Sequence, residues 1–106
     1  MTYQKKSPEE IRKIMEKNET NIIDVRSSPE RSDGYIQNST CMDVRGLDFE
    51  MKLTKLDKNK ILIIYCHAGN RAMAAASKAD SLGFKKVYMI DGGIVAWKKC
   101  KFPTEK

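Results

Sequence analysis

The sequence has few of the residues that mark disulfide-stabilised or membrane-spanning proteins. Only three cysteines occur in 106 residues, Cys41, Cys66 and Cys100, and none forms a Cys-x-x-Cys motif. An odd number without that spacing argues against a disulfide framework and favours a reducing, cytoplasmic compartment. No apolar run approaches the roughly 18 residues of a membrane span. The basic N-terminus has no apolar segment behind it, so we expect no signal peptide.

Histidine is scarcer still. The single histidine, His67, adjoins Cys66, and no second pair of ligands has usable spacing, so we predict no metal site and no cofactor. The net charge of +6 raises the question of nucleic-acid binding. The lysines, however, are scattered along the chain without interleaved aromatic residues, which is typical of a solvated surface. We therefore expect no nucleic-acid partner and no membrane partner.

Helix and strand signals alternate along the chain. Ser7, Pro8 and Glu10 form an N-cap, a first-turn proline and a capping box, which predict a helix over 8–17. Apolar and branched runs predict strands, and periodic or capped segments predict helices. The expected strands are 21–25, 39–44, 60–65 and 86–90; the expected helices are 47–56, 70–82 and 92–100, with a short helical turn before Gly34. This alternation predicts a single α/β domain over 1–106, with a small parallel sheet of four or five strands and helices on both faces.

Cys66 lies where the most apolar predicted strand ends and a helix begins. Ligands of open parallel sheets bind beyond the carboxyl ends of the strands. Residues 67–70 must turn the chain into the helix, and the N–H groups at a helix start lack helical partners. Such a loop forms a cradle for an anion, and with Arg71 nearby it favours the reactive thiolate. We therefore predict that Cys66 is a nucleophile, and that Cys41 and Cys100 are packing or half-exposed residues.

Four segments follow one another in the order found in a known family. They are IIDVRSSPERSDGYI, CHAGNRA, LGFKKVYMIDGGIVAW and KKCKFP. Together they resemble the single-domain rhodanese family. The resemblance implies a rhodanese-like three-layer sandwich, with a parallel sheet of about five strands between helices. It also implies a sulfurtransferase, in which Cys66 carries sulfane sulfur as a persulfide from a donor such as thiosulfate to a thiophilic acceptor. The acceptor would be cyanide, a small-molecule thiol, or a thioredoxin-like or other protein thiol.

The resemblance also assigns roles within the loop. The outer sulfur of the persulfide would accept hydrogen bonds from the backbone N–H groups of five residues: His67, Ala68, Gly69, Asn70 and Arg71. Arg71 either binds an oxyanion such as that of thiosulfate or forms a salt bridge that supports the loop. His67 either lines the mouth of the site or is a solvated loop residue. Asp24 and Arg26 are interpreted as a supporting structural pair, and Ile94, Val95 and Trp97 as core.

The chain departs from the family pattern at several positions outside the nucleophile. Tyr35 stands where histidine is usual, and Lys101 replaces a frequent glycine. Ala72 stands where serine is frequent, so a hydroxyl group that would hydrogen-bond the thiolate is absent. None of these changes removes Cys66.

Two other functional classes stay open. Cysteine phosphatases and arsenate reductases, which resemble this family, use a Cys-x5-Arg loop, whereas Cys66 and Arg71 form a Cys-x4-Arg loop. A tetrahedral oxyanion needs several donors at about 2.7–3.2 Å, and the shorter loop is better suited to one extra sulfur atom. The other open class is a non-enzymatic interaction module, and the intact Cys66 argues against it. A peroxide-sensing or disulfide-exchange role would require a resolving cysteine near Cys66, and Cys41 is the residue to examine.

Overall fold

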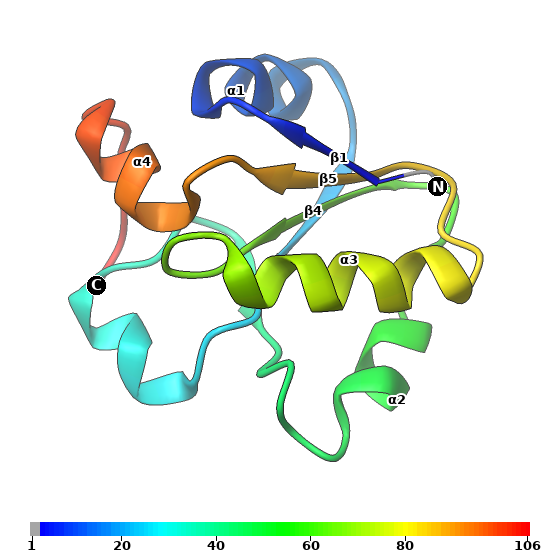
Figure 1. The fold of residues 1–106 in the computed structure, drawn as a ribbon. Coiled ribbons are helices and arrows are strands. Elements are labelled where there is room, and N and C mark those ends of the chain that lie inside the picture. The colour runs from blue at the N-terminus through cyan, green and yellow to red at the C-terminus, as the bar shows by residue number, and fades with distance from the viewer. Residues whose placement is uncertain (1–2) are drawn as a thin grey trace.

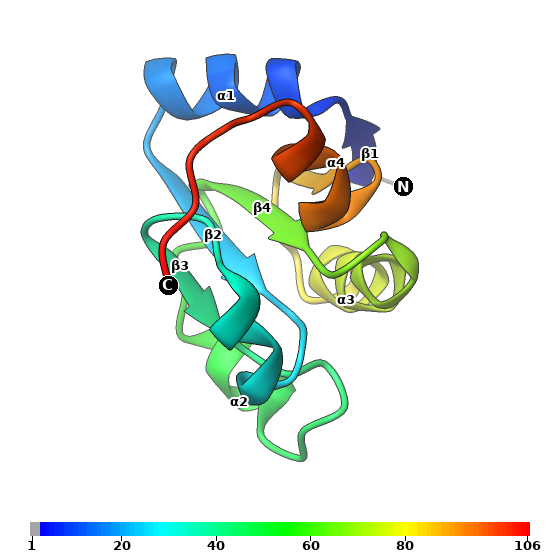
Figure 2. The same cartoon turned by 90° about the vertical axis from the view of Figure 1, so that its left-hand side faces the viewer.

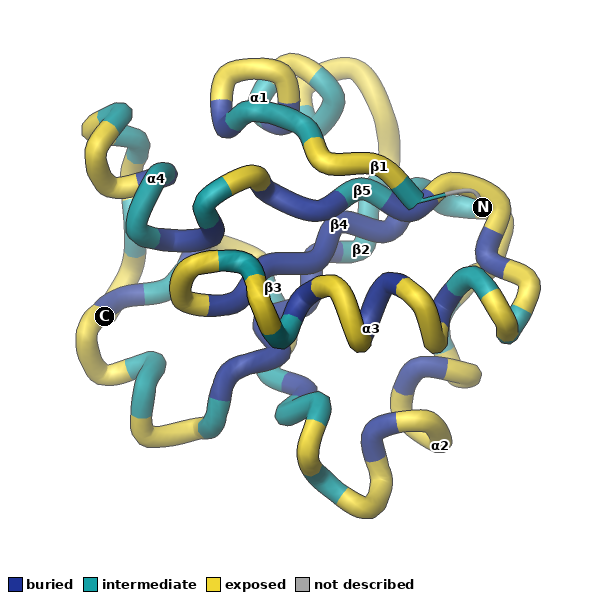
Figure 3. Tube along the Cα trace, in the orientation of Figure 1, coloured by how far each residue is buried: buried dark blue, intermediate teal, exposed yellow. Residues whose placement is uncertain are grey.

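The computed structural model describes residues 3–106 and contains a parallel sheet of five strands. Across the sheet, the strands are β1 (Tyr3–Lys6), β5 (Val87–Ile90), β4 (Ile61–Tyr65), β2 (Thr20–Asp24) and β3 (Ser39–Cys41). All four pairings are parallel. β4 therefore occupies the centre, where both of its faces are covered, and Figure 3 shows it buried along most of its length. A continuous apolar run is the pattern expected of such a strand.

Helices cover both faces of the sheet, as Figures 1 and 2 show. Helices α1 (Pro8–Lys17) and α4 (Gly93–Lys99) pack on one face, where Ile11, Ile63 and Trp97 belong to one apolar cluster. Helices α2 (Phe49–Thr54) and α3 (Asn70–Ser81) pack on the other face, where a second cluster includes Phe49, Ile64 and Ala76. The three-layer α/β sandwich predicted from the sequence is confirmed.

The predicted capping signals form as expected. The Ser7 side chain accepts a hydrogen bond from the Glu10 N–H at 3.2 Å, and the Glu10 carboxylate accepts one from the Ser7 N–H at 3.3 Å. The predicted turn is a 3₁₀ helix, η1 (Ser28–Asp33), which ends at Gly34 and has its own capping box between Ser27 and Glu30. This second box fixes the position of the Glu30 side chain.

Strand β1 is absent from the sequence-based prediction. Its residues, YQKK, are mostly polar and half-buried at best, so they carry no apolar periodicity. Pairing with β5 nevertheless satisfies their backbone groups, in the register Tyr3 to Val87. Lysines are typical of an edge strand, because they discourage pairing with another chain.

Several predicted boundaries are wrong by a few residues. The strand expected over 39–44 ends at Cys41, and the helix expected over 47–56 spans only 49–54, leaving Leu47 fully exposed. Beyond β3 the chain keeps single hydrogen bonds to the β2 segment, from the Met42 N–H to the Asp24 carbonyl at 2.8 Å. Isolated bonds of this kind do not extend a strand. Across residues 3–106, no helix has the length and apolar character needed to cross a membrane.

Candidate active site

Cys66 follows the last residue of the central strand β4, at the carboxyl edge of the sheet. Its side chain is only 1% exposed and packs with the cluster beneath α2 and α3. The chain then turns through residues 67–69 into α3, with Gly69 at φ +122°, a conformation that side chains strongly disfavour. This turn brings the Gly69 N–H to 3.0 Å from the Cys66 sulfur, which accepts its hydrogen bond.

The other residues of the loop differ in what they contribute. His67, Ala68 and Asn70 are exposed, and Gly69 and Arg71 are half-buried. Among the described residues, Gly69 is the one expected loop donor whose N–H reaches the sulfur of Cys66. The hydrogen bonds predicted from all five loop residues concern the outer sulfur of a persulfide, so they stay a prediction.

The N-terminus of α4 forms backbone hydrogen bonds with the start of the loop. The carbonyl of Cys66 accepts a hydrogen bond from the Ile94 N–H at 3.0 Å, and that of His67 accepts one from the Val95 N–H at 3.2 Å. Gly93 lies so close that a Cβ atom there would be 2.5 Å from both of these carbonyl oxygens. Only glycine fits at this position, so Gly93, the first residue of α4, allows the helix to lie directly against the loop.

Arg71 forms a two-pronged ion pair with Glu30 of η1. Its two terminal nitrogens donate to the two carboxylate oxygens of Glu30 at 2.7 and 2.9 Å, across 41 residues of sequence. The hydrogen bonds from Arg71 hold the pKa of the Glu30 carboxyl well below its usual range, and those same bonds raise the pKa of Arg71. Arg71 thus forms a salt bridge, and its binding of an oxyanion stays a prediction.

Asp24 and Arg26 form a buried ion pair at the end of β2. Asp24 accepts from Arg26 Nη2 at 2.7 Å and from Arg26 Nε at 2.9 and 3.1 Å, and Arg31 approaches the same carboxylate at 3.1 Å. Burial opposes the charge on Arg26, but its hydrogen bonds and charge attraction to Asp24 outweigh that penalty and raise its pKa. Arg26 also donates to the Gly34 carbonyl at 2.9 Å. The pair therefore ties β2 to the segment that carries Glu30.

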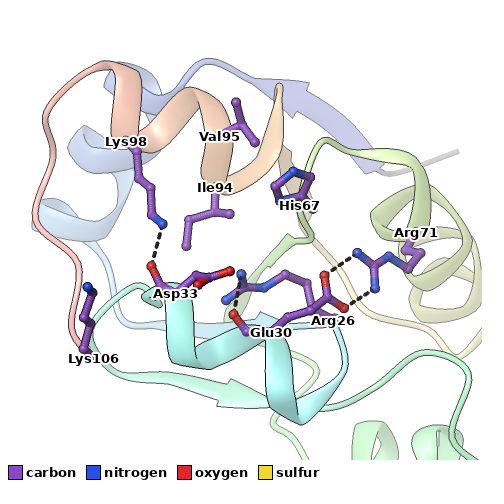
Figure 4. Close-up of a pocket in the computed structure, with 9 residues that line it drawn as sticks. All are labelled: Arg26, Glu30, Asp33, His67, Arg71, Ile94, Val95, Lys98 and Lys106. Carbon is purple, nitrogen blue, oxygen red and sulfur yellow. Dashed lines mark hydrogen bonds and ion pairs between the residues drawn. The ribbon is translucent and has the colours of Figure 1, made fainter.

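A pocket of about 450 Å³ opens beside the loop, between η1 and α4 (Figure 4). It contains cationic, acidic and apolar groups and the single histidine: Arg26, Arg71, Lys98 and Lys106; Glu30 and Asp33; Ile94 and Val95; and His67. The prediction that Val95 is core is therefore wrong, because it is half-buried and lines this pocket, whereas Ile94 and Trp97 are buried. His67 is exposed and also lines the mouth, so its two suggested positions coincide.

The other two cysteines lie away from Cys66. Cys41 pairs with Asp24 in the β2–β3 register, and Asp24 pairs with Tyr65 in the β2–β4 register. Because adjacent strands are about 4.8 Å apart, Cys41 and the end of β4 are separated by about 9–10 Å, beyond the roughly 7 Å limit for a disulfide. Desolvation and the Asp24 charge raise the pKa of the Cys41 thiol, and desolvation and the Glu9 carboxylate raise that of Cys100. Both are half-exposed and neither has the environment of Cys66.

Comparison with known proteins identifies the family of this chain. A model of the rhodanese-like domain family matches residues 7–100. The chain belongs to the rhodanese-like domain family. A rhodanese-related protein from Thermoplasma volcanium has the same fold, with a TM-score of 0.86 over 97% of this chain and 98% of that one, at 24% identity.

Two curated relatives carry named activities. The rhodanese-like domain is 31% identical over 98 residues to thiosulfate sulfurtransferase GlpE of Pseudomonas aeruginosa, covering 92% of this chain and 86% of that protein. It is 36% identical over 97 residues to tRNA uridine(34) hydroxylase of Corynebacterium diphtheriae, covering 85% of this chain but 31% of the hydroxylase. The family and the first relative support a sulfurtransferase-type enzyme.

Sequence reasoning missed two residues that contact the loop of the rhodanese-like domain, Glu30 and Gly93. Glu30 was visible only as part of a helical turn, and nothing local connects it to Arg71. Gly93 was visible as half of a glycine pair, a signal of close backbone approach that does not say what approaches. Within residues 3–106, no group of three or more His, Cys, Asp or Glu side chains is arranged to hold a metal ion.

Proposed function

We propose that this rhodanese-like domain is a sulfurtransferase in which Cys66 carries the transferred sulfur as a persulfide. The observation that carries the proposal is the hydrogen bond of 3.0 Å from the Gly69 N–H to the Cys66 sulfur. A backbone donor at a helix start favours negative charge on sulfur, which is the form that attacks. The likeness to thiosulfate sulfurtransferase GlpE supports thiosulfate as a donor.

The proposed reaction has two steps. The Cys66 thiolate attacks the outer sulfur of thiosulfate, so that a new S–S bond forms while the S–S bond of thiosulfate breaks and sulfite leaves with the electron pair. The carbon of cyanide, or the thiolate of an acceptor, then attacks the outer sulfur of the persulfide. The S–S bond on the enzyme breaks, the sulfur leaves as thiocyanate or as a new persulfide, and the Cys66 thiolate is restored.

The loop is proposed to hold the outer sulfur while it waits for the acceptor. After the first step the negative charge resides on that sulfur, above the Cys66 sulfur and inside the ring of N–H groups from His67 to Arg71. Ala72 is buried directly after the loop and offers no hydroxyl group, so backbone donors carry this task. The α4 contacts to the carbonyls of Cys66 and His67 support the proposal, because they keep the peptide planes of the loop in one orientation.

Partners and location follow from the same proposal. We propose small-molecule sulfur donors and acceptors, with a thioredoxin-like or other protein thiol as a further acceptor, since the mouth of the site is exposed at His67 and Ala68. We also propose a reducing, cytoplasmic compartment, supported by three unpaired cysteines.

The test measures the intact mass of the protein after incubation with thiosulfate. The wild type is expected to gain one sulfur atom and to lose it when cyanide is added. Cys66→Ser should gain none, whereas Cys41→Ser, a matched change in a half-exposed cysteine, should gain one. A parallel assay with an aryl phosphate should show negligible hydrolysis. Hydrolysis through Cys66, with no uptake of sulfur from thiosulfate or another sulfane donor, would instead establish the phosphatase alternative.

A further inference from the structure

The guanidinium of Arg71 is paired with a carboxylate in the wall of the pocket. Both of its terminal nitrogens donate to Glu30, at 2.7 and 2.9 Å, and Figure 4 shows the two side chains facing each other. This is the same two-pronged geometry in which arginine binds a free oxyanion. Glu30 therefore occupies the edge of Arg71 at which an oxyanion would bind in this two-pronged geometry.

Glu30 is itself held firmly in place. Its Oε1 accepts hydrogen bonds from the Ser27 N–H at 3.0 Å and from the Ser27 hydroxyl at 2.9 Å, in addition to the bond from Arg71. The pKa of its carboxyl lies well below the usual range, chiefly because of Arg71, so the group is ionised at neutral pH. A carboxylate that accepts four hydrogen bonds, two from Ser27 and two from Arg71, does not swing away at little cost.

The second arginine of the pocket is also neutralised. Arg26 is 2% exposed and paired with Asp24, which is fully buried. Each of the two guanidinium groups beside the loop is thus paired with a carboxylate, and Asp24 is shared between Arg26 and Arg31. A dianion such as thiosulfate would meet the negative charge of Glu30 at Arg71.

The facing wall of the pocket suits an organic group better. Val95 is half-buried and presents apolar surface beside Ile94, which lines the pocket but is only 1% exposed. The Lys98 ammonium donates to the backbone carbonyl of Asp33 at 2.6 Å. A pocket of about 450 Å³ is within the usual range for small organic ligands. An alkyl chain attached to a sulfane sulfur would cover this apolar surface, whereas thiosulfate leaves it in contact with water.

We propose that Glu30 determines donor selectivity: by occupying Arg71 it disfavours thiosulfate relative to organic persulfides. This inference rests on the sulfur-transfer function proposed above. With a persulfide donor, the Cys66 thiolate attacks the outer sulfur, a new S–S bond forms, the S–S bond of the donor breaks, and the alkyl thiolate leaves with the electron pair. Glu30 acts through Arg71 and is a positioning residue.

The experiment compares the rate of Cys66 persulfide formation from thiosulfate and from benzyl persulfide. The variants are wild type, Glu30→Gln and Glu50→Gln. Glutamine retains an oxygen that accepts from Ser27 but removes the charge that neutralises Arg71. Glu50 pairs with Lys78 at 3.0 Å between α2 and α3, so its variant removes a carboxylate from an ion pair outside the pocket.

Glu30→Gln should raise kcat/KM for thiosulfate about tenfold or more, mainly by lowering KM. A tenfold change corresponds to the contribution of about one charge-assisted hydrogen bond to binding. The rate with benzyl persulfide should change by less than about threefold, and Glu50→Gln should leave both rates unchanged. A fall in the thiosulfate rate of Glu30→Gln, or an equal change for both donors, would overturn the inference.

A binding measurement keeps this inference separate from the function on which it rests. Calorimetry of thiosulfate with Cys66→Ser should show affinity weaker than about 1 mM, and the double variant with Glu30→Gln should bind about tenfold more tightly. Tight binding to Cys66→Ser alone would overturn the inference even if Glu30→Gln does not fold. The affinity could rise as expected while no donor loads Cys66. That result would contradict both the sulfurtransferase proposal and the inference on donor selectivity. It would still show that Glu30 competes with the anion for Arg71.

Discussion

Two arginine–carboxylate pairs lie within one region of this protein, and they differ in nearly every physical respect. Asp24 and Arg26 are two residues apart, with side chains 0% and 2% exposed. Glu30 and Arg71 are 41 residues apart, with side chains 32% and 27% exposed. Removing one partner of a buried pair leaves an uncompensated charge in a poorly solvated place, whereas water replaces the partner of an exposed pair. We therefore expect the first pair to contribute far more to the stability of the fold than the second, which lies partly exposed in the wall of the pocket.

The largest effect should come from breaking the buried pair. Asp24→Asn removes the charge that compensates Arg26 and weakens its link to Arg31, so the free energy of unfolding should fall by about 3–5 kcal/mol. Urea denaturation measures this directly. Asp43→Asn is the matched control, because Asp43 and Arg45 form a surface pair at 3.7 Å, and its cost should stay below about 1 kcal/mol. Equal losses for the two variants would show that burial does not distinguish the pairs.

The next largest effect is expected at the contact between Gly93 of α4 and the loop. Gly93→Ala places a methyl group 2.5 Å from the carbonyl oxygens of Cys66 and His67, with φ at +61°. We expect a loss of about 1–3 kcal/mol in stability and a larger proportional loss of sulfur loading at Cys66, because the loop must move. Gly83→Ala is the control: its φ is +93° but no atom lies within 4 Å of the added methyl group. Its stability should also fall, but its rate of sulfur loading should match that of the wild type.

A smaller change in stability is expected at the exposed pair. Glu30→Gln should lower the free energy of unfolding by less than about 1 kcal/mol, since solvent screens a partly exposed pair. Urea denaturation of this variant and of Asp24→Asn under the same conditions compares the contributions of the two pairs to the free energy of unfolding. A loss as large as that of Asp24→Asn would mean that Glu30 serves chiefly to hold the fold, and that the two pairs do not differ in their contribution to stability.

The smallest effect is the pH dependence of the stability difference between the wild type and Glu30→Gln. Arg71 lowers the pKa of Glu30 in the folded protein, so the carboxylate binds fewer protons when folded than when unfolded. Its contribution to stability is therefore fully present above the unfolded value of about 4.3 and declines as the pH falls below it. The difference in stability between wild type and Glu30→Gln should be larger at pH 7 than at pH 3. A difference that grew on acidification would have the wrong sign for a lowered pKa.

Much of the fold could be predicted because its signals are local. The capping box of Ser7 and Glu10, the apolar run of β4 and the alternation of helices and strands each depend on neighbouring residues. β1 could not be predicted, because its four residues carry no apolar pattern and become a strand only where β5 offers an edge in register with Tyr3. Its existence depends on a partner more than 80 residues away in sequence.

The candidate site divides in the same way. The sequence by itself determined that Cys66 follows a buried strand, that Gly69 turns the chain, and that Arg71 comes five residues after the cysteine, because all three belong to one strand–loop–helix segment. Only the tertiary structure decided that Glu30 occupies Arg71 and that Gly93 lies against the loop. Those contacts arise where parallel strands end at a common edge and bring η1, the loop and α4 together. No local propensity encodes them, because each depends on chain segments that meet only after the sheet has formed.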